Sequence, residues 1–84
     1  MVRIIVERRF EPPVTETDLQ AVIDRMAPCF ELHKVTWRRS FLSHDRRRMF
    51  CEYDATDVES VRDLQRQAEA PFEQAWAAEV FEAT

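Results

Sequence analysis

Glu7 and Glu52 are the residues of this 84-residue sequence best suited to chemistry. Each lies in a segment where apolar and polar residues alternate, as they do in β-strands. If the two carboxylates share a partly dry cavity, they raise each other's proton affinity and suit acid–base catalysis or a divalent ion. Arg38 would then stabilise a developing enolate or oxyanion. Ion pairs with Arg9 and Arg38 are the alternative interpretation of the same carboxylates.

His44 and Asp45 are the candidate metal ligands. They are adjacent in the polar segment 43–47, and an imidazole suits nickel, zinc or copper. We interpret this pair as half of a surface metal site that another subunit completes. The alternative is an exposed turn histidine without a ligand, because neither His44 nor the other histidine, His33, is part of an H-x-x-x-H or C-x-x-C spacing.

Aromatic and hydroxyl side chains near the two glutamates are the candidate contacts for a ligand. They are Trp37, Ser40, Phe50 and Tyr53. Large side chains on an apolar strand face usually belong to the core, which is the alternative for the aromatic residues. Cys51 is predicted to be a core thiol, since Glu52 adjoins it and a reactive thiol needs positive surroundings. We expect Cys51 and Cys29 to be reduced thiols of a cytosolic protein.

Two kinds of periodicity predict the elements that position these residues. Alternation of period two predicts strands within 2–9, 35–43, 47–55 and 74–81. Apolar stripes at helical spacing predict a helix that follows capping residues 15–18 and ends at Pro28. A second helix is predicted to follow residues 56–59 and to end at Pro71.

The segment 35–55 is predicted to be a β-hairpin. A three-residue loop would set Arg38 opposite Glu52 and Ser40 opposite Phe50. Opposite charges that face each other contribute roughly 0.2–1 kcal/mol. A slip of one residue would move every side chain to the other face, so the register is the most sensitive part of this prediction.

The predicted order β-α-β-β-α-β is that of an α+β ferredoxin-like fold, with an antiparallel sheet and both helices on one face. We expect a single domain over residues 1–84. Two helices cannot cover both faces of the sheet. We therefore expect a second copy to cover the open face, in a homodimer of the dimeric α/β-barrel type, with Glu7 and Glu52 near the interface.

Charge and hydropathy restrict the partners. The net charge of −4 argues against nucleic acid as the main partner, although the three arginines at 46–48 could contact phosphates. No apolar run approaches the roughly 20 residues of a membrane helix. The amino-terminal segment M-V-R-I-I-V-E-R-R is charged early, unlike a signal peptide. We therefore expect a cytoplasmic protein with no nucleic-acid or membrane partner.

Several segments together resemble one family. They read R-I-I-V-E-R-R-F at 3–10, T-E-T-D-L at 15–19, V-T-W-R-R-S-F-L-S at 35–43, M-F-C-E-Y-D-A at 49–55 and D-V-E-S-V-R at 57–62. This pattern is similar to that of small bacterial proteins grouped as a domain of unknown function. The resemblance implies a ferredoxin-like fold, dimeric α/β-barrel assembly and at least one nickel-binding relative. Nickel is therefore the ion expected at His44 and Asp45.

Three positions depart from that family's pattern. Leu64 stands where members often have a histidine in the second helix. Arg46 stands where they often have a glycine in the hairpin turn. Family members also tend to have a glycine near the position of Glu69, and this chain has none. A role that depends on the helix histidine is therefore not expected here.

Two functional hypotheses follow. The first is a cytoplasmic, dimeric binding protein for a metal ion, nickel by resemblance, or for a small ligand. The second is a cofactor-free enzyme, as related dimeric barrels include cyclases, isomerases and monooxygenases. In it, Glu7 or Glu52 would move a proton of a hydrophobic aromatic or polyketide-like substrate.

Overall fold

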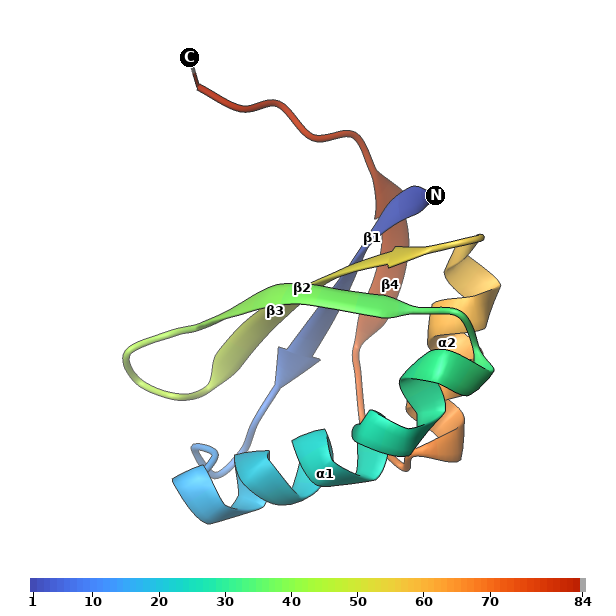
Figure 1. The fold of residues 1–84 in the computed structure, drawn as a ribbon. Coiled ribbons are helices and arrows are strands. Elements are labelled where there is room, and N and C mark those ends of the chain that lie inside the picture. Colours follow the sequence, from blue (N-terminus) through green and yellow to red (C-terminus); the bar gives the residue numbers. More distant parts are fainter. Residues whose placement is uncertain (84) are drawn as a thin grey trace.

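The computed structural model of the protein describes residues 1–83 as a four-stranded antiparallel sheet with two helices on one of its faces (Figure 1). The elements in chain order are β1 (Val2–Arg9), α1 (Glu16–Leu32), β2 (Thr36–Leu42), β3 (Arg48–Ala55), α2 (Val58–Gln67) and β4 (Gln74–Ala78). The strands are arranged as β2-β3-β1-β4, so β1 and β3 are central. The predicted element order and ferredoxin-like α+β fold are confirmed.

Alternate residues of the central strands face the helices and form the core. Ile4 and Val6 of β1 and Tyr53 of β3 are fully buried there. Val61 and Leu64 of α2 are equally inaccessible, so the position where the resembling family often has a histidine is a packing position here. Burial of this apolar surface is the main term that favours folding. Neither helix within residues 1–83 has the length and apolar character of a membrane-crossing segment.

The other face of the sheet, called the open face below, has no helix over it (Figure 1). Its residues include Arg3, Ile5, Glu7, Phe41, Phe50, Glu52, Asp54 and Trp76. Two large apolar side chains on this face are strongly exposed, Phe41 at 57% and Trp76 at 40%. A single chain therefore presents a mixed apolar and charged surface to solvent.

α1 continues past Pro28 to Leu32, so the predicted end at the proline is wrong. Proline has no N–H to donate, and the axis of α1 changes direction in its last turns (Figure 1). Tertiary packing stabilises the turn beyond the proline. The ring of Phe30 lies 6.4 Å from that of Trp37 and 6.2 Å from that of Tyr53, and these contacts override the local preference.

Three non-glycine residues have a left-handed backbone, where glycine is favoured because it has no Cβ. They are Lys34 (φ 56°), Arg46 (φ 64°) and Glu69 (φ 54°). Lys34 and Glu69 terminate the two helices. After Glu69, the N–H of Ala70 donates to the carbonyl of Gln65 at 2.8 Å, which is the bond of a Schellman motif. The sequence contains no glycine, so residues less suited to this conformation occupy these positions.

β2 contains a β-bulge that changes the predicted hairpin register. Trp37 pairs with Tyr53 and Arg39 pairs with Glu52, so Arg38 is an extra residue between the two pairs. The prediction that Arg38 faces Glu52 is therefore wrong. Because of the bulge, the consecutive residues Arg38 and Arg39 both form ion pairs with acidic residues of β3.

Beyond the bulge, the side chains of β2 lie on the opposite face from the one predicted. Ser40 pairs with Cys51 and faces the helices, not Phe50 and the open face. Phe41 takes the place predicted for Ser40, opposite Phe50. A single inserted residue has this effect because strand side chains alternate with a period of two.

The hairpin loop and the last strand also differ from prediction in length. The N–H of Ser43 donates to the carbonyl of Arg48 at 2.9 Å, which leaves four residues, 44–47, in the loop instead of three. β4 ends at Ala78, so residues 79–81 do not extend the sheet.

Replacing Glu69 by glycine should stabilise the protein, because it relieves the left-handed strain at the end of α2. We expect a gain of about 0.5–1 kcal/mol in the free energy of unfolding, measured by urea denaturation. Glu69→Ala is the matched control, since it removes the same carboxylate but keeps the Cβ. An equal gain from the alanine variant would contradict the explanation.

Candidate functional site

The hairpin loop holds the carboxylate of Asp45 in a fixed position beside His44. Asp45 Oδ1 accepts hydrogen bonds from the Ser43 hydroxyl at 2.6 Å and from the backbone N–H of Arg47 at 3.1 Å. The Ser43 bond and then the Arg47 bond lower the pKa of Asp45, so the group stays ionised. His44 is exposed at the same loop. An oriented carboxylate and an accessible imidazole thus belong to consecutive residues of this loop.

A single chain does not complete a metal site. Within residues 1–83, no three histidine, cysteine, aspartate or glutamate side chains come together as possible ligands. His33 is engaged elsewhere, with its Nε2 2.6 Å from Gln67 Oε1. Cys29 and Cys51 are free thiols buried in the core. The hairpin loop therefore contributes two potential metal donors per chain, the imidazole of His44 and the carboxylate of Asp45.

The carboxylates of β3 form an ion-pair network with three arginines of the open face. Glu52 accepts from Arg3 at 2.8 Å and from Arg39 at 3.1 Å. Asp54 accepts from Arg3 at 2.9 Å and pairs with Arg38 at 3.5 Å. The bond to Asp54 is the first cause of a raised pKa for Arg3. Glu52 is therefore a partly buried ion-pair acceptor between two guanidinium groups.

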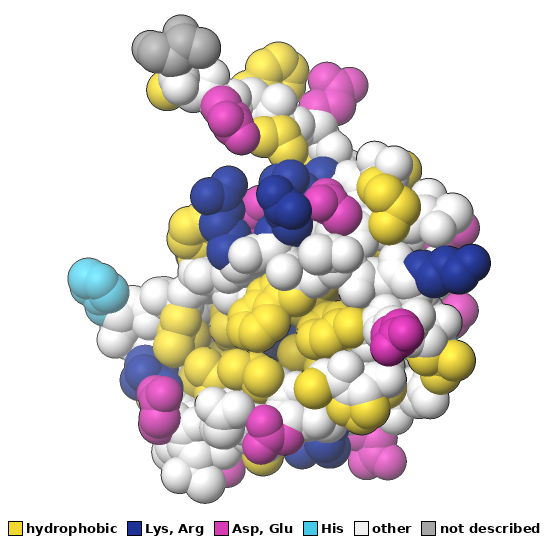
Figure 2. Space-filling view, viewed as in Figure 1, with side chains coloured by type: hydrophobic (Ala, Val, Ile, Leu, Met, Phe, Trp, Pro, Cys, Tyr) yellow, Lys and Arg dark blue, Asp and Glu magenta, His cyan; other side chains and the backbone are white. Residues whose placement is uncertain are grey.

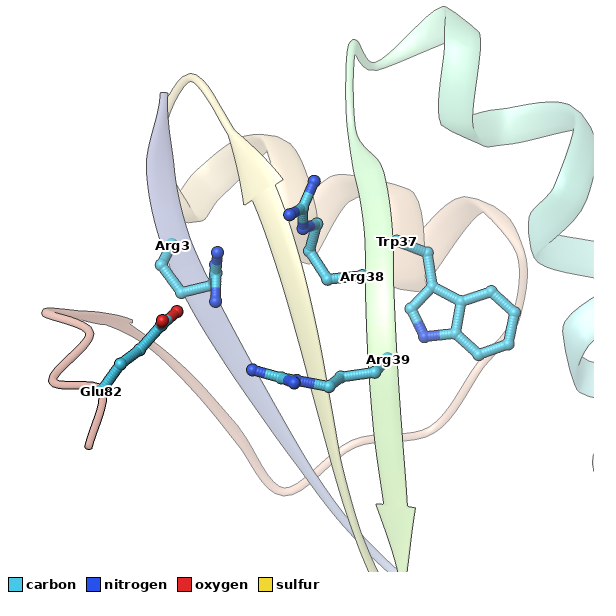
Figure 3. Close-up of a pocket in the computed structure, with 5 residues that line it drawn as sticks. All are labelled: Arg3, Trp37, Arg38, Arg39 and Glu82. Atoms are coloured by element: carbon cyan, nitrogen blue, oxygen red, sulfur yellow. The ribbon is translucent and has the colours of Figure 1, made fainter. Parts of the chain in front are cut away.

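A hollow of about 280 Å³ lies beside this network. Its walls are Arg3, Trp37, Arg38, Arg39 and Glu82. Figure 3 shows the three arginines reaching into one region from β1 and β2, with Trp37 on the other side of β2. The three guanidinium groups share the two carboxylates of Glu52 and Asp54, and Glu82 also lines the hollow, so the formal charges around it balance.

Glu7 lies on the same face as Glu52 but has different partners. Its Oε2 accepts from the indole N–H of Trp76 at 2.7 Å and from Gln74 Nε2 at 3.0 Å. In the β1–β3 register Glu7 faces Phe50, so the two glutamates are diagonal neighbours and do not form a directly facing pair. Both glutamates thus take part in cross-strand contacts of the open face.

The four predicted ligand contacts are divided between the two faces of the sheet. Trp37 lies on the helix side, and its indole N–H donates to Ser40 Oγ at 2.9 Å. Tyr53 is buried on the same side. Phe50 lies on the open face, 5.9 Å below the guanidinium of Arg48. The structure therefore does not bring all four together around one ligand.

A buried arginine in β1 is the feature that the sequence analysis missed. Arg8 is 4% exposed, and its Nη2 donates to Gln65 Oε1 at 2.7 Å and to the Tyr53 hydroxyl at 3.2 Å. Its Nη1 donates to the Pro71 carbonyl at 3.0 Å. Burial is the main cause that raises the pKa of Tyr53 to about 12.

The alternation of β1 contained the signal for this cluster. Residues of even number in Val2–Arg9 face the helices, as Ile4 and Val6 do. The same period places Arg8 on the apolar face. A charged residue in phase with core residues indicates a buried charge, and such charges gather at functional sites.

Glu52→Gln should destabilise the protein, because it removes the negative charge that Arg3 and Arg39 share and replaces one of the two accepting oxygens with an NH2 donor, at a side chain that is only 13% exposed. We expect a loss of about 1–3 kcal/mol in the free energy of unfolding, measured with urea at neutral pH. Glu73→Gln is the control, since Glu73 and Arg9 are both more than half exposed and 4.0 Å apart. That change should cost less than about 0.5 kcal/mol. Equal effects of the two variants would contradict a structural role for Glu52.

Comparisons with known proteins identify the family to which this chain belongs. The family model described as nickel responsive protein SCO4226-like matches residues 5–77. A comparison with curated proteins finds no match. Among solved structures, the chain is similar to SCO4226 from Streptomyces coelicolor A3(2), with a TM-score of 0.83 and 10% sequence identity. The superposition covers 95% of this chain and 99% of that chain.

The structural similarity shows a shared fold, since the identity is low. The family match is the stronger finding, because it extends over most of the chain, from the middle of β1 to β4. The resemblance seen in the sequence is confirmed. The chain belongs to the SCO4226-like family of nickel responsive proteins.

Proposed function

We propose that the protein binds nickel as a homodimer, with His44 and Asp45 of two hairpin loops as the ligands. The geometry of the hairpin loop carries this proposal, because Asp45 is oriented by Ser43 and Arg47 next to an exposed imidazole. Two such loops would supply two imidazoles and two carboxylates, donors that suit nickel. The family description as nickel responsive supports the choice of ion.

The composition of the open face supports the homodimer. Phe41 and Trp76 are exposed there, and Ile5 and Phe50 lie beside them in the sheet register. Exposed aromatic and aliphatic side chains gathered on one sheet face are typical of an interface. A chain of this size also buries a smaller share of its surface than a larger domain does, so association would stabilise it. We place the protein in the cytoplasm, where its two free thiols would stay reduced.

Acid–base catalysis by the glutamates has less support. Glu52 is held by two guanidinium groups, and Glu7 accepts from Trp76 and Gln74. A general base needs a free lone pair within reach of its substrate. The contacts of both carboxylates favour structural roles.

His44→Ala should abolish nickel binding, because it removes the imidazole of each loop. Native mass spectrometry and calorimetry of untagged protein should show one nickel ion for every two chains in the wild type and none in the variant. His33→Ala is the matched control, since His33 is hydrogen-bonded to Gln67. Loss of nickel from the His33 variant with retention in the His44 variant would overturn the proposed site.

Phe41→Glu should convert the dimer to a monomer, because it places a charge in the apolar part of the open face. Light scattering coupled to size-exclusion chromatography would measure the mass. Leu32→Glu is the control, since Leu32 is 67% exposed but belongs to α1, on the other side of the sheet. A wild-type protein that is monomeric at micromolar concentration would contradict the proposed assembly.

A further inference from the structure

The Arg8 cluster is a buried positive charge without a negative partner. The acceptors around the guanidinium are an amide oxygen, a hydroxyl and a backbone carbonyl, from Gln65, Tyr53 and Pro71. All three are neutral, since the raised pKa of Tyr53, about 12, keeps its phenol protonated. Among the ion pairs formed by residues 1–83, none includes Arg8. A buried charge normally has a charged partner, because burial removes its hydration.

The side-chain amide of Gln65, beside Arg8, also lacks one of its hydrogen-bond partners. Its Oε1 accepts from Arg8 at 2.7 Å, but its Nε2 is buried and has no hydrogen-bond partner in the described part of the chain. Buried amide nitrogens are nearly always bonded, because an unmet donor loses its hydration without compensation. The Nε2 belongs to the same amide group as Oε1, so this unmet donor lies beside the guanidinium. The cluster therefore combines a buried positive charge that has only neutral acceptors with an amide donor that has no acceptor.

Apolar surface adjoins these donors. Gln65 lines a hollow of about 420 Å³ at the end of α2, whose other walls include Ala70, Pro71 and Phe72. The cluster also reaches α1, where the Met26 sulfur lies 3.7 Å from Arg8 Nη2. Figure 2 shows hydrophobic side chains gathered between the β2–β3 hairpin and α1. A molecule bound at the cluster would therefore have an apolar body.

We propose that Arg8 and Gln65 form a binding site for a small organic carboxylate with an apolar body. One carboxylate oxygen would accept from Nε–H of the Arg8 guanidinium, which uses Nη1 and Nη2 for its bonds to Pro71, Tyr53 and Gln65. The other oxygen would accept from Gln65 Nε2. The planar fork of arginine suits a carboxylate, and the hollow beside Ala70 and Phe72 would take the apolar body. This site is separate from the hairpin loop and does not depend on nickel.

Gln65→Glu tests the proposal, because it places a carboxylate where Arg8 now meets an amide. The probes are hexanoate and benzoate, with hexanol and benzyl alcohol as uncharged analogues of similar shape. In the wild type, the two carboxylates should shift the NMR resonance of the Arg8 Nε–H group saturably, and the alcohols should not. In the Gln65→Glu variant, the internal carboxylate should weaken this binding at least tenfold and raise the melting temperature.

Gln67→Glu is the matched control, since it adds the same charge two residues further along α2, at an exposed residue that contacts His33. It should leave carboxylate binding unchanged. If Gln65→Glu fails to fold, Gln65→Met removes the amide donor without adding charge and should also weaken binding. A wild-type protein that ignores both carboxylates, or a folded Gln65 variant that binds them as well as the wild type, would overturn the proposal.

Discussion

Two helices cover only one face of the four-stranded sheet, and this constraint determines the environment of almost every strand residue. Residues one position apart in β1 have opposite surroundings, with Ile4 in the core and Ile5 on the open face. The face of the sheet that the helices cover forms the apolar core. The open face combines exposed aromatic residues with a network of paired charges.

The same constraint puts Arg8 inside the protein. The alternation of side chains in β1 continues to the end of the strand. Arg8 therefore lies on the same face of the sheet as Ile4 and Val6, which is the face that the helices cover. The cluster around it satisfies most of its donors with neutral oxygen atoms and leaves the amide nitrogen of Gln65 without a partner. Apolar residues of similar volume would pack at least as well. A buried charge that has no charged partner is more common at functional sites than in ordinary cores.

The hairpin and the sheet have different roles in this fold. The bulge at Arg38 directs two consecutive arginines to Glu52 and Asp54, which stabilises the paired charges of the open face. The loop beyond it holds Asp45 and His44 away from that network. Because one loop contributes only two donors, metal binding and self-association are linked in the proposed function. The membership in a nickel responsive family and the uncovered sheet face are therefore consistent with each other.

The sequence by itself determined what depends on neighbouring residues: the order of the elements, the buried face of β1 and β3, and the capping segments 15–18 and 56–59. Within those segments the structure shows Thr15 and Asp57 as the caps, where they accept from the backbone N–H groups of Asp18 and Ser60. Periodicity and capping are local, so they can be read along the chain. Only the tertiary structure decided where α1 ends, because Phe30 beyond Pro28 is held by rings of β2 and β3. It also decided the bulge at Arg38 and the partners of Arg8. Those contacts join residues far apart in sequence, and no local pattern specifies them.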